Sequence, residues 1–249
     1  MNKEIQYFID KMVQVPWDKW KYFKNFKVVF KLGSPICMTS PFLNFDALIS
    51  HAMLLDSLGE NFFILPRKFN ISPFLPEKSR KIPILKTGEI YHASVAQFFP
   101  NNLHVETIYK RFEERWSEKL KAKKIRIGSG HYRSYMMKEP YISCREVIFY
   151  VRGEMNCCKK LIIKNVYGIG NDFRIGFGSI RDIVFEEIPE DWSIVANEIA
   201  MRPIPISMCS EYDDAAYLPY RSPYWDPKNV GLCVPPGAKC KLKEARDEI

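Results

Sequence analysis

The sequence predicts an α+β domain, because segments with strand and helix patterns alternate along the chain. The run FKVVFKLGSP at 26–35 is expected to be a strand that ends in a turn, and an amphipathic helix follows at 42–59. After an insertion, CREVIFYVRG at 144–153 alternates apolar and polar residues as a strand does. A second helix at 154–166 leads into a glycine-rich loop and a last strand. This order is typical of a ferredoxin-like (RRM-like) domain, in which helices cover one face of an antiparallel sheet.

The helix at 42–59 has the clearest pattern of these elements. Asn44 or Asp46 can cap its start, apolar residues recur at helical spacing, and Gly59 ends it. Residues 83–99 contain further strand material before a turn at Pro100. The last third of the chain is expected to be irregular, because its prolines interrupt every pattern.

These elements predict a simple domain organisation. Residues 1–25 form an N-terminal extension, and 26–249 form the ferredoxin-like domain. A charged insertion interrupts this domain at about 104–140, and the glycine-rich loop occupies 168–178. A helix at 107–122 is one interpretation of the charged run inside the insertion.

Charge points to a polyanionic partner. The 249 residues carry a formal net charge of +8, with a pI near 9.0. Residues 108–138 hold ten Lys and Arg against three Glu, so this segment alone accounts for +7. Neutralising phosphates releases condensed counterions, and aromatic residues interleaved with the charges can stack on bases. The insertion is therefore expected to bind RNA through Lys119, Lys121, Lys123, Lys124, Arg126, His131, Tyr132 and Arg133.

The glycine-rich loop is the second candidate for RNA contact. Its glycines can expose backbone N–H groups and let a phosphate approach closely, and Arg174 adds a charge inside the loop. The glycines follow a helix and open a strand, which excludes a dinucleotide-binding motif, and the sequence has no P-loop ending. A strained hairpin without ligand is the alternative. The residues predicted to lie against RNA are Gly168, Gly170, Arg174, Gly176 and Gly178.

Neither a metal nor a cofactor is expected. Seven cysteines occur without a C-x-x-C pair, which suits a reducing compartment better than a disulfide framework or a zinc site. No apolar run approaches the roughly 20 residues that span a bilayer, and the N-terminus lacks a signal-peptide pattern. The protein is expected to be cytoplasmic, without a membrane partner.

Catalysis is not expected either. A metal-independent ribonuclease needs a general acid and a general base around a 2′-hydroxyl. Of the four histidines, His51 lies near the apolar face of the first helix and His92 in an apparent strand. His131 alone has a basic, flexible neighbourhood, but no carboxylate or second histidine is close in sequence.

Several segments together resemble a known family. FKVVFKLGSPI and FLNFDALISHAML resemble the first strand and helix of RAMP-superfamily proteins. HASVAQF, YKRFEERW, IGIGNDFRIGFGSI, RPIPI and YRSPYW with CVPP resemble, in this order, the type IV CRISPR-associated subunit that holds the 5′ handle of the guide RNA. The resemblance covers most of 26–236 and implies a RAMP domain whose insertion is a thumb. It also implies a non-catalytic subunit that binds CRISPR guide RNA, caps the backbone filament and contacts the backbone and large subunits.

Two other interpretations stay open. The alternative is a metal-independent endoribonuclease that processes precursor CRISPR RNA, although about 70 residues follow the glycine-rich loop, more than is usual for such an enzyme. A third role, compatible with guide binding, is contact between the thumb or tail and target DNA near the PAM.

Overall fold

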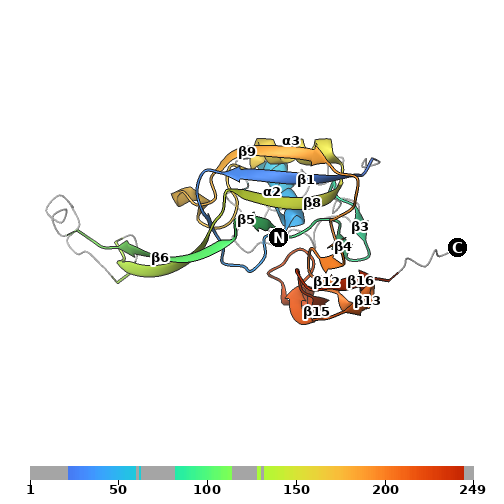
Figure 1. The fold of residues 1–249 in the computed structure, drawn as a ribbon. Coiled ribbons are helices and arrows are strands. Elements are labelled where there is room, and N and C mark those ends of the chain that lie inside the picture. Colours follow the sequence, from blue (N-terminus) through green and yellow to red (C-terminus); the bar gives the residue numbers. More distant parts are fainter. Residues whose placement is uncertain (1–21, 60–61, 63–81, 114–127, 130–131, 244–249) are drawn as a thin grey trace, which may run out of the picture.

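A four-stranded antiparallel sheet forms the centre of the structure, a computed structural model that describes residues 22–59, 62, 82–113, 128–129 and 132–243 (Figure 1). The strand order is β5-β8-β1-β9. The strands are β1 (Lys24–Leu32), β5 (Gln97–Phe99), β8 (Glu146–Gly153) and β9 (Ile180–Glu187). β1 pairs with β8 on one side and β9 on the other, and ion pairs such as Lys27–Glu186 at 3.0 Å join β1 to β9. The sheet therefore brings together segments that lie more than 100 residues apart.

Two α-helices, α2 (Phe45–Leu58) and α3 (Met155–Asn165), pack side by side on the inner face of this sheet. In β1 every second residue, from Phe26 to Leu32, is buried against them, as the alternation in its sequence predicts. α2 ends at Gly59, which adopts a φ of +57° and donates its N–H to the Leu55 carbonyl. The order of strands and helices along the chain is β–α–β–β–α–β. The α+β class expected from the sequence is confirmed.

A long hairpin projects from the sheet between β5 and β8 (Figure 1). It consists of β6 (Asn102–Lys110) and β7 (Tyr135–Ser143), which are paired from Asn102↔Ser143 to Lys110↔Tyr135. At its base β7 also pairs with the short β2 (Ile36–Cys37). The helix considered for 107–122 is wrong at its start, because Thr107–Lys110 belong to β6; residues 114–127 lie outside the described part.

The C-terminal region is more regular than expected. It forms a second core of Ile194, Ile204, Val234 and their neighbours, and its strands gather beside the sheet, away from the hairpin tip (Figure 1). The strands of this region are only two to five residues long and pair with one another. Its sequence therefore shows no extended alternation of apolar and polar residues. Its strands are β10 (Val195–Ala196), β11 (Ile199–Ala200), β12 (Ile204–Pro205), β13 (Cys209–Tyr212), β14 (Ala216–Pro219), β15 (Val230–Val234) and β16 (Cys240–Leu242).

The remaining short elements are β3 (Lys86–Thr87), β4 (Ile90–Tyr91) and the 3-10 turns η5 (Phe173–Ile175), η6 (Ile206–Met208) and η7 (Pro227–Asn229). The expected extension at 1–25 lies mostly outside the described residues, but Lys24 and Asn25 already belong to β1. None of the described helices is long and apolar enough to cross a bilayer.

Candidate nucleic-acid interface

The hairpin presents two different faces. One face, which carries every second residue of β6 and its partner in β7, is apolar and open to solvent: Leu103, Val105, Tyr109 and Met136 are 61–69% exposed. Lys138 is exposed in the middle of this face. On the other face the Lys110 ammonium lies 5.9 Å from the Tyr135 ring centroid. Exposed apolar and cationic side chains on one projecting element suit a partner with both phosphates and bases.

The structure describes some of the residues predicted for the insertion. Arg133, which is predicted to contact RNA, is exposed near the end of the described hairpin. Tyr132 is half-buried and meets Phe112 edge-on at 5.7 Å, so part of its ring stabilises the end of the hairpin. The remaining predicted residues of the insertion lie outside the described part of the chain: Lys119, Lys121, Lys123, Lys124, Arg126 and His131.

The glycine-rich loop lies against the base of the hairpin. Its Phe177 ring is 6.1 Å from Tyr141 of β7, which in turn stacks on His104 of β6 at 5.3 Å. Asn171 donates its backbone N–H to the Cys37 carbonyl at 2.8 Å. The loop and the hairpin, far apart in sequence, therefore contact each other at the hairpin base.

Packing within the protein explains three of the four predicted glycines. A Cβ on Gly178 would lie 1.8 Å from the Ile169 carbonyl oxygen, and one on Gly170 would lie 2.5 Å from the Ile36 side chain. A Cβ on Gly168 would lie 2.8 Å from Cβ of Phe173. Gly176 is different, because it has a φ of +109° and open space where its Cβ would be. Among these glycines Gly176 alone leaves room for a partner at its α-carbon.

The loop also uses most of its backbone N–H groups internally. Ile169 donates to Gly178, Gly178 to Pro35 and Gly176 to Phe173, at 2.7–3.1 Å. The N–H groups of Asn171, Ile175 and Phe177 also donate to carbonyls of the protein. These N–H groups are not available to a phosphate, so a partner of the loop would meet the exposed side chains of the turn. Phe173 is 48% exposed and Ile175 63% exposed, and Arg174 between them is exposed as well.

Cys37, Glu139 and Asp172 meet where the loop, β2 and β7 join. The Cys37 thiol lies 3.6 Å from Glu139 and 4.0 Å from Asp172. Burial, with the hydrogen bond and charge of Glu139 and the charge of Asp172, raises the pKa of Cys37 to about 11. The ligand atoms of these three residues lie within 4.8 Å of one another. Without a cation between them, this environment keeps the Cys37 thiol protonated.

His92 belongs to a cluster that the sequence did not reveal. Its Nδ1 lies 3.2 Å from the Asp191 carboxylate and its Nε2 lies 2.8 Å from the Thr87 hydroxyl. Asp191 also accepts hydrogen bonds from Ser193 and Arg152. Burial opposes its ionisation, but the hydrogen bonds from His92 and Ser193 outweigh it and hold the pKa of Asp191 well below its usual range. Asp191 lies 99 residues from His92, so no local spacing could indicate the pair.

Two C-terminal segments that carried the family resemblance, RPIPI and YRSPYW, meet inside the protein. Arg202 is fully buried and donates to the Tyr91 and Ala93 carbonyls and to the Tyr224 hydroxyl, the last at 3.0 Å. Tyr224 donates to the buried Asp46 carboxylate of α2 at 2.7 Å. Burial by itself would lower the pKa of Arg202, but the interactions with Tyr224 and Asp46 outweigh it and raise the pKa, so the guanidinium stays charged. These residues join the C-terminal region to the sheet domain.

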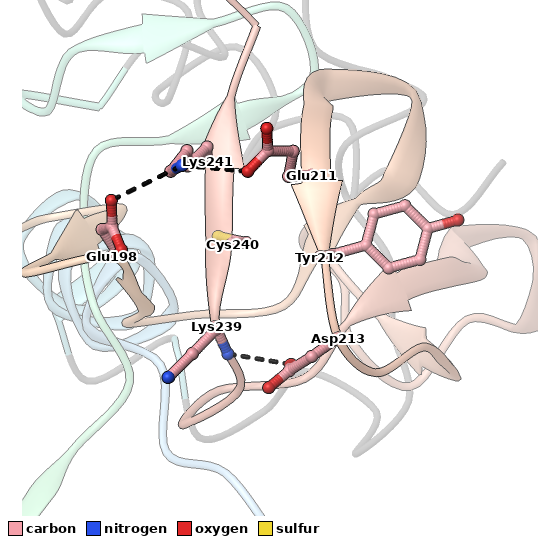
Figure 2. A pocket seen from close by; sticks show the side chains of 7 residues that line it. All are labelled: Glu198, Glu211, Tyr212, Asp213, Lys239, Cys240 and Lys241. Atoms are coloured by element: carbon pink, nitrogen blue, oxygen red, sulfur yellow. Dashed lines mark hydrogen bonds and ion pairs between the residues drawn. The ribbon is translucent and has the colours of Figure 1, made fainter.

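A surface hollow of about 230 Å³ is lined by residues of the paired strands β13 and β16 and of the segments next to them (Figure 2). Lys241 bridges Glu198 at 3.8 Å and Glu211 at 2.9 Å, and the Lys239 N–H donates to Asp213. The lining carries three carboxylates against two ammonium groups. It therefore offers no surplus of positive charge to a polyanion.

Comparison with known proteins gives two results. A family model described as CRISPR type IV associated protein Csf3 matches residues 77–236, more than half of the chain. Among solved structures, the chain is similar to a chain in the cryo-EM structure of the Type III-B Cmr-beta bound to cognate target RNA. The identity is 11% and the TM-score 0.38, over 74% of this chain and 67% of that chain. No match was found among curated proteins.

Proposed function

Because the chain belongs to the family of CRISPR type IV associated protein Csf3, we propose that it is a non-catalytic, RNA-binding subunit of a type IV-like CRISPR effector ribonucleoprotein. The observation that carries the RNA-binding part is the projecting hairpin, whose base contacts the glycine-rich loop through Tyr141 and Phe177. Its exposed apolar face and its cations suit single-stranded RNA, which proteins bind by tracking the phosphates and stacking on the bases.

The finer role is holding the 5′ handle of the guide and capping the backbone filament. The β–α–β–β–α–β order and the sheet order β5-β8-β1-β9 support a ferredoxin-like RAMP domain. The hairpin then corresponds to the thumb, which would also meet the backbone and large subunits. Contact with target DNA near the PAM is compatible with this role.

Nuclease activity is the alternative that this proposal rejects. Both ring nitrogens of His92 are within hydrogen-bond distance of protein groups, Asp191 and Thr87, which would have to be displaced for a 2′-hydroxyl to bind. His104 stacks on Tyr141 at the hairpin base, and His51 packs edge-on against Phe62 at 5.0 Å. Burial lowers the pKa of His51, which favours its neutral form. His131 lies outside the described residues.

A matched pair of charge variants tests RNA binding. Arg133 and Lys138 of the hairpin are replaced by Gln in one variant, and Lys159 and Lys160 of α3 in the other. Binding of a fluorescein-labelled, repeat-derived single-stranded RNA is followed by anisotropy between low and physiological salt. Each lost phosphate contact lowers the slope of log K against log salt by about 0.7, so the hairpin variant should lose roughly 1.4.

The α3 variant should keep the wild-type slope, although it loses the same net charge. Equal losses in both variants would mean that net charge attracts RNA without a defined surface. An unchanged slope in the hairpin variant would contradict RNA binding by the hairpin.

A further inference from the structure

The turn Phe173–Ile175 carries exposed side chains on a rigid support. Ile175 donates its N–H to the Asp172 carbonyl at 3.0 Å and Gly176 donates to Phe173 at 3.1 Å, so the turn is closed by its own hydrogen bonds. Gly168 lies under Phe173, where any side chain would collide with it. The closed turn fixes the direction in which the Phe173 side chain leaves the backbone. Binding to the exposed ring would therefore not carry the entropic cost of ordering a flexible loop.

Phe173 also has a cation over its ring. The Arg174 guanidinium carbon lies 5.9 Å from the centroid of the Phe173 ring. An aromatic ring takes a base by stacking, and a neighbouring guanidinium pairs with phosphate oxygens. Phe173 thus suits the base of a nucleotide and the adjacent Arg174 suits its phosphate.

We propose that Phe173 is a stacking platform for one unpaired nucleobase, with Arg174 on the phosphate of the same nucleotide. This inference rests on the proposed RNA-binding function and assigns the glycine-rich loop a side-chain role in place of a backbone cradle. The internal use of the loop N–H groups supports that choice. Phe177, in the same loop as Phe173, contacts Tyr141 of β7, so the loop that carries the platform lies against the hairpin base.

Single-stranded RNA with 2-aminopurine at successive positions tests the platform in the full-length protein. Stacking on Phe173 should quench the fluorescence at one position when the wild-type protein binds. Phe173→Leu keeps an apolar side chain over Gly168 but removes the aromatic face. It should abolish this quench and weaken binding roughly 5- to 150-fold, as expected for one lost base-stacking contact.

Ile175→Ala is the matched control, because it removes an exposed apolar side chain from the same turn without removing a ring. It should keep the quench and bind within about twofold of wild type. Arg174→Gln should keep the quench but lower the salt slope by about 0.7, the value for one single-strand phosphate.

The outcomes separate the platform from the proposed function. Bound RNA without a quenched position in the wild type, or a quench that survives Phe173→Leu, would overturn the platform while RNA binding stands. Equal weakening by Phe173→Leu and Ile175→Ala would also overturn it, because the ring would then contribute no more than any exposed apolar side chain of the turn. If the wild-type protein binds no RNA at all, the proposed function itself fails.

Discussion

Replacing Tyr224 by Phe removes one oxygen atom from the polar network that joins the C-terminal region to α2. That hydroxyl donates to both oxygens of Asp46, at 2.8 and 2.7 Å, and accepts from Arg202 at 3.0 Å. Asp46 and Arg202 are both completely buried. The pKa of Tyr224 is raised well above its usual range, by burial first and by the Asp46 charge next, so the phenol keeps the proton that it donates.

The loss of stability in Tyr224→Phe follows from the charges of Asp46 and Arg202, the two partners of the hydroxyl. A hydrogen bond to a charged group contributes about 1.5–3 kcal/mol, and a charged partner left unsatisfied in the interior costs at least as much. We therefore expect Tyr224→Phe to lower the free energy of unfolding by about 3 kcal/mol. For a chain of this size, roughly 2–4 °C are lost for each kcal/mol, so the melting temperature should fall by about 6–12 °C.

Tyr220→Phe is the matched control for this prediction. Its hydroxyl donates to Glu89 at 2.7 Å on the exposed surface, so the same chemical change removes a solvated hydrogen bond. The free energy of unfolding of the Tyr220→Phe variant should differ from that of the wild type by less than about 0.5 kcal/mol. Thermal unfolding followed by circular dichroism measures both variants. Equal shifts in the two would refute the argument that Arg202, Tyr224 and Asp46 tie the C-terminal region to α2.

The other predictions concern the loop, the insertion and catalysis. Gly176→Val should remain folded, at a strain cost of roughly 1–3 kcal/mol, and bind RNA more weakly, whereas Gly178→Val should lose its cooperative melting transition because of the clash with Ile169. If Gly176→Val also loses that transition, the loop is a strained hairpin only. Replacing four lysines of the insertion by Ala should flatten the salt slope by about 0.7 for each lost phosphate contact, and an unchanged slope would count against backbone tracking; these are Lys119, Lys121, Lys123 and Lys124. Repeat RNA incubated without metal should stay full length, and specific cleavage lost in His131→Ala would support the endoribonuclease alternative.

Local patterns predicted the elements that carry the sheet domain. The helix expected at 42–59 runs from Phe45 to Leu58, and the strand expected at 144–153 runs from Glu146 to Gly153. In both elements, the spacing of the apolar residues marks the face that packs against the core of the sheet domain. The run HVETIYK has the alternation of a strand, but the adjacent charges suggested a helix. Its partners in β7 lie 25 to 37 residues further along the chain, from Lys110↔Tyr135 to His104↔Tyr141.

The candidate site was harder to predict, because its contacts join distant segments. Nothing near Phe177 indicates that it meets Tyr141, and nothing near Asp46 indicates Tyr224, 178 residues away. The glycines were recognised as a loop, but the reason for most of them is the packing of Ile36, Ile169 and Phe173. The short C-terminal strands were missed because two to five residues do not establish a period.

The most direct test of the central claim uses the assembled ribonucleoprotein with 4-thiouridine placed in the 5′ handle of its guide. Crosslinking followed by mass spectrometry locates the peptides that touch these nucleotides. The account predicts crosslinks in β6–β7 and in the turn around Phe173 of this chain. Handle crosslinks confined to other subunits, in a complex that contains this chain, would contradict it.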